Sequence, residues 1–247
     1  LEPVYVRRTE DGERRDGSGD SADGRSAGGY SITTAGAEVV TAIVAGTVVG
    51  PSTIPPFEVE GECVDCRGAL LARYEDEMVR IDCADCGLTH LFAFLPPGGL
   101  VDRTPEEVVA ASDTFLRICY LSCMAGVCPG CTARTRRSFL GPSDTLSASV
   151  VGFSVVEEIG SSSGPAVVYE CERCGIWYYL TTGETLLFEP VVLEFFRDHG
   201  LDLHETPIWT LPWCLSAVTH EYSTVVSESP LRVTVRIPLE DETLVVT

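Results

Sequence analysis

Short segments rich in β-branched and aromatic residues recur along the chain, several with alternating apolar and polar positions, and they predict β-strands. The alternation is clearest in LRVTVRIP at residues 231–238. The predicted strands lie at residues 4–8, 30–33, 150–156, 167–171, 176–181, 222–226, 231–238 and 243–247. The last three predict a small antiparallel sheet at the end of the chain, with SESP as one of its turns.

A helical spacing of apolar residues follows the second predicted strand. Thr33 or Thr34 can cap this helix. Its apolar stripe consists of Val39, Val40, Ile43 and Val44. The uncharged apolar run at residues 39–50 has 12 residues, whereas a membrane-spanning helix needs about 20. The run therefore predicts a buried helix and no membrane span.

A capping box, TPEE at residues 104–107, predicts a second helix that continues to Met124. The side chains that this helix is expected to bury are Val108, Phe115, Leu116 and Cys119. A third helix is predicted between Pro190 and Gly200. Outside the regular elements, residues 10–28 predict a flexible hairpin tip. A linker is predicted at Pro51, Pro55 and Pro56.

The charge balance is strongly acidic, although the chain can build a core. The formal net charge is −20 and 45% of the residues are apolar, so the acidity is not that of a disordered tail. All 17 basic residues are arginines. Dense surface carboxylates without lysine are typical of proteins adapted to molar salt, where surface charge is screened. We interpret the source as a halophilic archaeon.

The most specific chemical signal is a set of four Cys-x-x-Cys motifs. Two such motifs on tight turns can complete a tetrahedral four-thiolate site, which is typical of structural zinc. Between the motifs of each pair lie 16 residues in the first case and 39 in the second. We expect two structural Zn²⁺ ions. Their ligands are expected to be Cys63, Cys66, Cys83 and Cys86, and Cys128, Cys131, Cys171 and Cys174.

Other states of these cysteines stay open on sequence alone. The thiols could be buried or redox-active without metal, and spacing does not exclude a crossed pairing of the four motifs. Residues 69–82 predict a hairpin that brings the first two motifs together. Cys119, Cys123 and Cys214 are expected to be buried hydrophobes. With no signal-peptide pattern and an odd total of 11 cysteines, reduced thiols and a cytoplasmic location are expected.

The predicted metal sites do not indicate an enzyme. A catalytic zinc keeps one position open for water, whereas four thiolates close both sites. The sequence contains no GxSxG, HExxH, P-loop or dinucleotide-binding motif. Residues expected to be structural are His90, His199, His204 and His220. The aromatic residues expected to form core, or alternatively to line a ligand pocket, are Trp177, Tyr178, Tyr179, Trp209 and Trp213.

The stretch LEPVYVRRTEDG, followed by GGYSITTAGAEVVTAIVAGTV, resembles the wing and final helix of a winged helix-turn-helix repressor, similar to the ArsR-like regulators of haloarchaea. In that family a cysteine-rich C-terminal domain of unknown function follows the winged domain. The motifs FEVEGECVDC, ARYEDE, CADCGLTH, GVCPGC, CERC and PIWTLPWC look like this domain. The resemblance covers nearly the whole chain and implies DNA binding and a homodimer.

Two departures from the family pattern affect DNA binding. The helix that enters the major groove precedes the wing in that family, whereas this sequence begins at Leu1, so a truncated N-terminus without base-reading residues is expected. The wing tip is also longer than the family's usual turn. Arg7 and Arg8 are the candidate contacts to the DNA backbone, with ordinary exposed arginines as the alternative. A basic run, Arg134, Arg136 and Arg137, could contact phosphate or an acidic surface.

The sequence thus predicts an α+β chain with a partial winged helix at residues 1–50. A first zinc-ribbon-like module with a helix is predicted at residues 51–127. A second such module with a helix and C-terminal antiparallel strands is predicted at residues 128–247. The predicted function is DNA-binding transcriptional regulation, with structural zinc in the C-terminal part. The alternatives are a zinc-ribbon interaction module without DNA binding of its own, and a ligand-sensing or redox-sensing domain.

Overall fold

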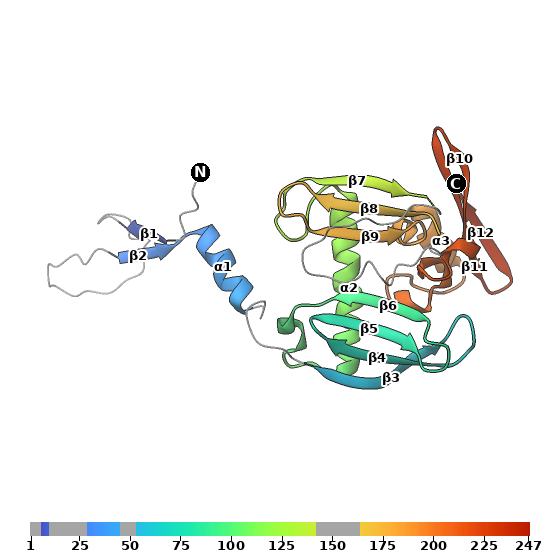
Figure 1. Ribbon diagram of the computed structural model, residues 1–247, viewed down its shortest axis with the longest axis horizontal. Coiled ribbons are helices and arrows are strands. Elements are labelled where there is room, and N and C mark those ends of the chain that lie inside the picture. The colour runs from blue at the N-terminus through green and yellow to red at the C-terminus, as the bar shows by residue number, and fades with distance from the viewer. Residues whose placement is uncertain (1–5, 10–28, 45–52, 142–163) are drawn as a thin grey trace.

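The computed structural model describes residues 6–9, 29–44, 53–141 and 164–247. Its strands are β1 (Val6–Thr9), β2 (Gly29–Ile32), β3 (Ile54–Glu62), β4 (Ala69–Glu75), β5 (Met78–Cys83), β6 (Thr89–Phe94), β7 (Thr135–Leu140), β8 (Ala166–Cys171), β9 (Trp177–Thr181), β10 (Ser223–Glu228), β11 (Leu231–Leu239) and β12 (Glu242–Val246). Its α-helices are α1 (Thr34–Val44), α2 (Pro105–Met124), α3 (Pro190–Asp198) and α4 (Thr219–Tyr222). The strands form antiparallel sheets in the orders β1–β2, β3–β4–β5–β6, β7–β8–β9 and β10–β11–β12 (Figure 1). The chain is therefore a mixed α and β protein built from small antiparallel sheets.

The N-terminal hairpin and helix form as predicted, but the helix is not buried. β1 pairs with β2, and α1 follows directly. The Gly36 N–H donates a hydrogen bond to Thr33 Oγ1 at 3.1 Å, which identifies Thr33 as the cap. The predicted burial is wrong because Val39, Val40 and Ile43 are 45%, 47% and 52% exposed, so the described sheets leave this face uncovered. The predicted tip at residues 10–28 lies outside the described residues.

The four-stranded sheet contains the predicted hairpin. β4 pairs with β5 from Leu70 opposite Cys83 to Glu75 opposite Met78. Asp76 and Glu77 form the two-residue turn with positive φ angles of 50° and 64°, as tight hairpin turns require. β6, which the sequence pattern did not reveal, pairs with β5 on its other side.

The predicted linker is wrong at Pro55 and Pro56, because both prolines belong to β3. β3 is an edge strand of its sheet, and its register shifts between Ile54 and Phe57. Proline lacks the N–H of a full ladder and is tolerated at edges and irregularities of this kind. β3 thus covers the outer side of β4 despite its prolines.

α2 packs against both cysteine-containing sheets (Figure 1). Its predicted capping box is present: the Thr104 N–H donates to Glu107 Oε2 at 2.8 Å, and the Glu107 N–H donates to Thr104 Oγ1 at 3.3 Å. Val108, Leu116 and Cys119 are buried as predicted, whereas Phe115 is half-buried. One helix therefore serves as the common support of the two sheets.

The remaining predictions of regular structure are confirmed where the chain is described. β8 and β9 correspond to the strands predicted at residues 167–171 and 176–181, and β10, β11 and β12 form the predicted C-terminal sheet. α3 is the predicted third helix, and Gly200 follows its end with a φ of 75°. The strand predicted at residues 150–156 lies outside the described residues.

One cluster of buried side chains runs through both cysteine-containing sheets, α2 and the C-terminal segment. Trp209 and Trp213 lie inside it and Tyr178 packs against it, so these members of the aromatic set form core. The buried Arg117 on α2 donates to Asp113 Oδ1 at 2.8 Å and to the carbonyl oxygens of Leu203 and Thr206 at 3.1 and 2.7 Å. This arginine ties the loop after α3 to α2. None of the described helices is long and apolar enough to cross a membrane.

Candidate metal centres

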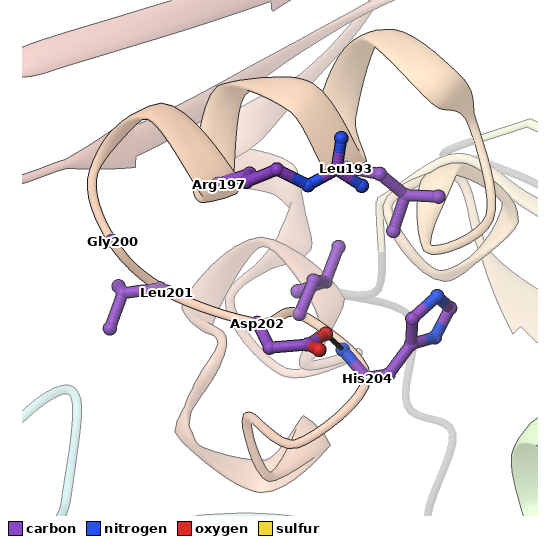
Figure 2. A pocket seen from close by; sticks show the side chains of 7 residues that line it. Leu193, Arg197, Gly200, Leu201, Asp202 and His204 are labelled. Atoms are coloured by element: carbon purple, nitrogen blue, oxygen red, sulfur yellow. Dashed lines mark hydrogen bonds between the residues drawn. The ribbon is translucent and has the colours of Figure 1, made fainter.

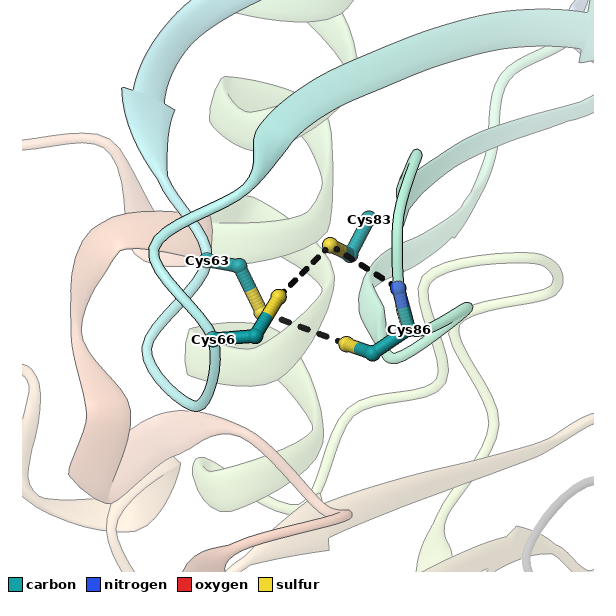
Figure 3. Close-up of side chains that lie close together, drawn as sticks. All are labelled: Cys63, Cys66, Cys83 and Cys86. Carbon is teal, nitrogen blue, oxygen red and sulfur yellow. Dashed lines mark hydrogen bonds between the residues drawn. The ribbon is translucent and has the colours of Figure 1, made fainter.

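The first cysteine cluster joins two turns of the four-stranded sheet. Cys63 and Cys66 lie on the turn between β3 and β4, whereas Cys83 is the last residue of β5 and Cys86 lies on the turn that follows it. The four sulfur atoms point toward one another (Figure 3), all within 4.8 Å. Cys63 Sγ is 3.6 Å from Cys86 Sγ, and Cys66 Sγ is 3.4 Å from Cys83 Sγ.

The second cysteine cluster has the same geometry. Cys128 Sγ is 3.6 Å from Cys174 Sγ, and Cys131 Sγ is 3.4 Å from Cys171 Sγ. All four sulfur atoms again lie within 4.8 Å of one another. Each motif therefore faces its nearest partner along the chain, as expected, and the crossed pairing is not the one observed.

Main-chain hydrogen bonds shape each of the four cysteine turns in the same way. The N–H of the first cysteine donates to the carbonyl five residues on, at 2.9, 2.9, 2.8 and 2.8 Å, and its own carbonyl accepts the N–H four residues on, at 2.9, 3.1, 2.8 and 3.2 Å. The residue after the second cysteine has a positive φ in every turn. These residues are Arg67 (63°), Gly87 (75°), Thr132 (59°) and Gly175 (73°). These main-chain hydrogen bonds therefore give all four cysteine turns the same backbone conformation.

Both clusters fit a tetrahedral metal ion. At a metal–sulfur distance of about 2.3 Å, the sulfur atoms of a tetrahedral site are about 3.8 Å apart. The shortest separations in the two clusters, 3.4 and 3.6 Å, approach that spacing. All eight thiols are free rather than joined in disulfides. The eight predicted ligands therefore form two closed four-sulfur sets that could each hold one metal ion, and thiolate donors suit a soft or borderline ion.

Backbone amides favour the thiolate form of one cysteine in each cluster. The N–H groups of Cys86 and Asp85 donate to Cys83 Sγ and lower the pKa of that thiol to about 6. The N–H groups of Cys174 and Arg173 do the same for Cys171, whose pKa is also lowered to about 6. Because metals bind the thiolate, these hydrogen bonds favour metal binding at Cys83 and Cys171.

The charges beside the two clusters differ in sign. Next to the first cluster stand Glu62, Asp65 and Asp85, with Arg67 paired to Glu62 at 3.6 Å. The turns and strands that carry the second cluster contain four arginines and two glutamates: Arg134, Arg136, Arg137 and Arg173, with Glu170 and Glu172. The second surface is thus locally basic on a chain of net charge −20.

The other three cysteines belong to neither four-sulfur set. Cys119, Cys123 and Cys214 are buried, and burial raises the pKa of each thiol, for Cys123 to about 12. Neutral buried thiols behave as small hydrophobes, as the sequence led us to expect.

The histidines and the candidate DNA contacts lie outside the clusters. His90 Nδ1 donates to the Trp209 carbonyl at 2.9 Å, and its buried Nε2 has no partner among the described residues. Burial lowers the pKa of His90, so the ring is neutral. Arg7 and Arg8 lie in β1 opposite Ser31 and Tyr30, but their side chains are outside the described part of the chain.

Sequence reasoning missed a buried polar network beside the second sheet. Tyr120 on α2 donates to Glu184 Oε1 at 2.9 Å, and the Thr181 N–H donates to Glu184 Oε2 at 2.7 Å. Burial raises the pKa of Glu184 to about 7. The local sequence around Glu184 does not signal burial, because Tyr120, which covers its carboxylate, comes from a distant part of the chain. The network holds the end of β9 against α2.

A pocket of about 310 Å³ lies between the last turn of α3 and the loop that follows it (Figure 2). Its polar side chains are Arg197, Asp202 and His204, and Asp202 Oδ1 already accepts the His204 N–H at 2.8 Å. The pocket contains none of the eight clustered cysteines. The pocket is therefore separate from the two candidate metal centres.

Comparison with known proteins gives one match. No curated protein and no solved structure matches the chain. Residues 60–247 match the profile of a domain of unknown function, DUF7351, and this range contains both cysteine clusters, α2 and the C-terminal sheet. Because the match covers well over half of the sequence, the chain belongs to the DUF7351 family.

Proposed function

We propose that the protein is a DNA-binding transcriptional regulator of the ArsR-like winged-helix type from a halophilic archaeon, with two structural zinc ions in its C-terminal part. The proposal gives the chain no enzymatic role and places it in the cytoplasm, where reduced thiols persist. The observation that supports the proposal most directly is the β1–β2 hairpin, which leads directly into the capped helix α1.

The hairpin and helix suit a wing and final helix. An antiparallel hairpin projecting beside a helix can contact the DNA backbone, and Arg7 and Arg8 lie on its first strand. The exposed stripe of Val39, Val40 and Ile43 suits the contact between two subunits of a dimer. DNA binding and dimerisation are both parts of the proposal.

Zinc is the metal that the donor set favours. Four thiolates close the site against water, and structural zinc takes this arrangement without adding redox chemistry. In both clusters the metal would tie the start of one hairpin strand to the end of its partner. The expected content is therefore two zinc ions per chain, measured by elemental analysis of the purified protein.

Selection from random DNA duplexes tests the regulatory role. A chain extended by the residues encoded upstream is expected to enrich one duplex sequence, while the present chain enriches none. Replacing Arg7 and Arg8 by Gln in the extended chain removes two phosphate contacts and lowers the slope of log affinity against log salt by about 1.8. The matched control replaces Arg232 and Arg236. An extended chain that enriches no sequence would refute the proposal.

Redox sensing is a second candidate because Cys66, Cys86 and Cys174 are exposed at the rims of the clusters. Exposed thiolates can be oxidised, and oxidation removes them as ligands. Release of zinc by mild peroxide, followed with a colorimetric chelator, would support this role. Retention of both ions would count against it.

A further inference from the structure

The two cysteine clusters belong to two copies of one structural module. In both copies the seventh residue after the first cysteine stands opposite the third cysteine: Leu70 faces Cys83, and Thr135 faces Cys171. The four cysteine turns also share their hydrogen bonds and their positive φ position. β4 and β7 are therefore equivalent strands, as are β5 and β8.

The modules also agree just before the first cysteine. Gly61 and Gly126 occupy the same position with positive φ angles of 112° and 82°. The next residue bridges to the following strand in both copies, with Glu62 opposite Ala69 and Val127 opposite Arg134. The equivalence thus extends to the chain that enters each module.

The modules differ in what precedes this glycine. In the first module, β3 continues along the outer side of β4 as far as Ile54 opposite Tyr74. In the second module the equivalent residues belong to the C-terminal turn of α2, which ends at Met124. α2 cannot lie along β7 as a strand, so β7 is an edge strand among the described residues.

Within the described part of the chain, no strand pairs with this edge of β7 from Arg137 onward. The Glu172 N–H donates to the Arg134 carbonyl at 3.2 Å, so alternate residues of β7 bond to β8 and those between them face outward. The main-chain groups of Thr135 point away from β8, and its N–H donates to the Gly126 carbonyl at 3.2 Å. For Arg137 and Phe139, the next two outward residues, the described chain supplies no backbone partner.

The side chains along this edge are basic. Arg134, Arg136 and Arg137 are exposed. Arg136 Nη2 donates to Glu170 at 2.6 Å, but a guanidinium has further N–H groups for a second carboxylate. In the first module the position of Arg136 is held by Leu71, and Glu58 of β3 stands opposite it. A strand docked in the same register would place an acidic residue opposite Arg136.

We propose that the open edge of β7 binds an extended acidic segment of a partner protein, which adds a strand to the β7–β8–β9 sheet. The added strand repeats the role of β3 in the first module, where the sequence FEVEGE alternates apolar and acidic residues. Its main chain bonds to Arg137 and Phe139, and its carboxylates, which lie on one face of the added strand, contact Arg134 and Arg136. Such strand addition draws affinity from the main chain and selectivity from side chains.

A labelled acidic peptide, TVEVEVET, tests the proposal on the full chain at the lowest salt at which circular dichroism shows it folded. The charge-reversed peptide TVRVRVRT is the ligand control. Fluorescence anisotropy is expected to show binding of the acidic peptide alone. Replacing Arg134 and Arg136 by Gln should weaken binding about fivefold, whereas the same change at Arg232 and Arg236 on β11 should leave it unaltered.

A main-chain variant separates strand addition from simple charge attraction. Arg137→Pro removes one outward N–H that has no backbone partner among the described residues, so the sheet should survive. Peptide affinity should fall about fivefold relative to Arg137→Gln, which loses the same charge but keeps the N–H. The amide protons of Arg137 and Phe139 are expected to gain protection from hydrogen exchange in the complex. The proposal is overturned if the acidic peptide does not bind at about 1 mM. It is also overturned if these amides stay unprotected, or if duplex DNA binds through the same arginines and the peptide does not.

Discussion

Replacing Cys131 by Ser is expected to destabilise the fold more than the matched replacement of Cys66. Both residues are second cysteines of a first turn, and each substitution removes one sulfur ligand and is expected to release one of two metal ions. The two modules differ in the length of the connection between the two strands that the metal ion would tie together. Two residues join β4 to β5, whereas residues 141–165 join β7 to β8, so the second pair of strands depends more on a tie at its base.

Loop closure gives the size of this difference. The cost of closing a loop rises as three halves of RT times the logarithm of its length, and a connection of 25 residues against one of two differs by about 2 kcal/mol. For a chain of this size the melting temperature of Cys131→Ser should lie about 4–8 °C below that of Cys66→Ser.

Thermal unfolding followed by circular dichroism, with metal content measured on the same samples, checks this expectation. Each variant should hold one ion per chain while the parent holds two. Equal melting temperatures, or a larger loss for Cys66→Ser, would show that metal does not act mainly by closing the β7–β8 connection. Retention of two ions by either variant would refute the ligand assignment.

Two further predictions concern the buried polar groups. Arg117→Met leaves the Asp113 carboxylate buried without its cation and should lower the free energy of unfolding by about 3 kcal/mol; urea denaturation measures this, and the double variant with Asp113→Asn should recover part of the loss. Burial raises the pKa of Glu184 to about 7 from its ordinary 4.5, so the folded state binds a proton more tightly and stability falls as the pH rises through this range. Between about pH 6 and about pH 8 the free energy of unfolding should fall by about 1 kcal/mol. If a Glu184→Gln variant showed the same pH dependence in urea denaturation as the parent, Glu184 would not be the group that titrates.

The sequence predicted the elements whose signals are local. The capping box at Thr104, the proline at the start of α3 and the hairpin around Asp76 each depend on residues within a few positions of one another. The Cys-x-x-Cys motifs likewise predicted the cysteine turns, because a turn that presents two thiols specifies its own geometry. The pairing of nearest motifs was the favoured prediction, although spacing alone did not exclude the crossed one.

The features that the sequence did not predict depend on distant parts of the chain. Pro55 and Pro56 indicated a linker, but an edge position in the sheet tolerates both. The apolar stripe of α1 indicated burial, yet the periodicity of a helix does not reveal whether another element covers it. Arg117 and Asp113 have helical spacing, but their burial follows from the loop at Leu203 and Thr206.

The matching geometry of the two cysteine clusters has a practical consequence for spectroscopy. Cobalt substituted for the native metal would meet four thiolates at the same sulfur separations, 3.4 and 3.6 Å, in both places. The two absorption spectra should therefore overlap, and a titration of the parent chain would display a single chromophore. The cobalt affinity of each centre can be measured only with variants in which the other cluster is disrupted.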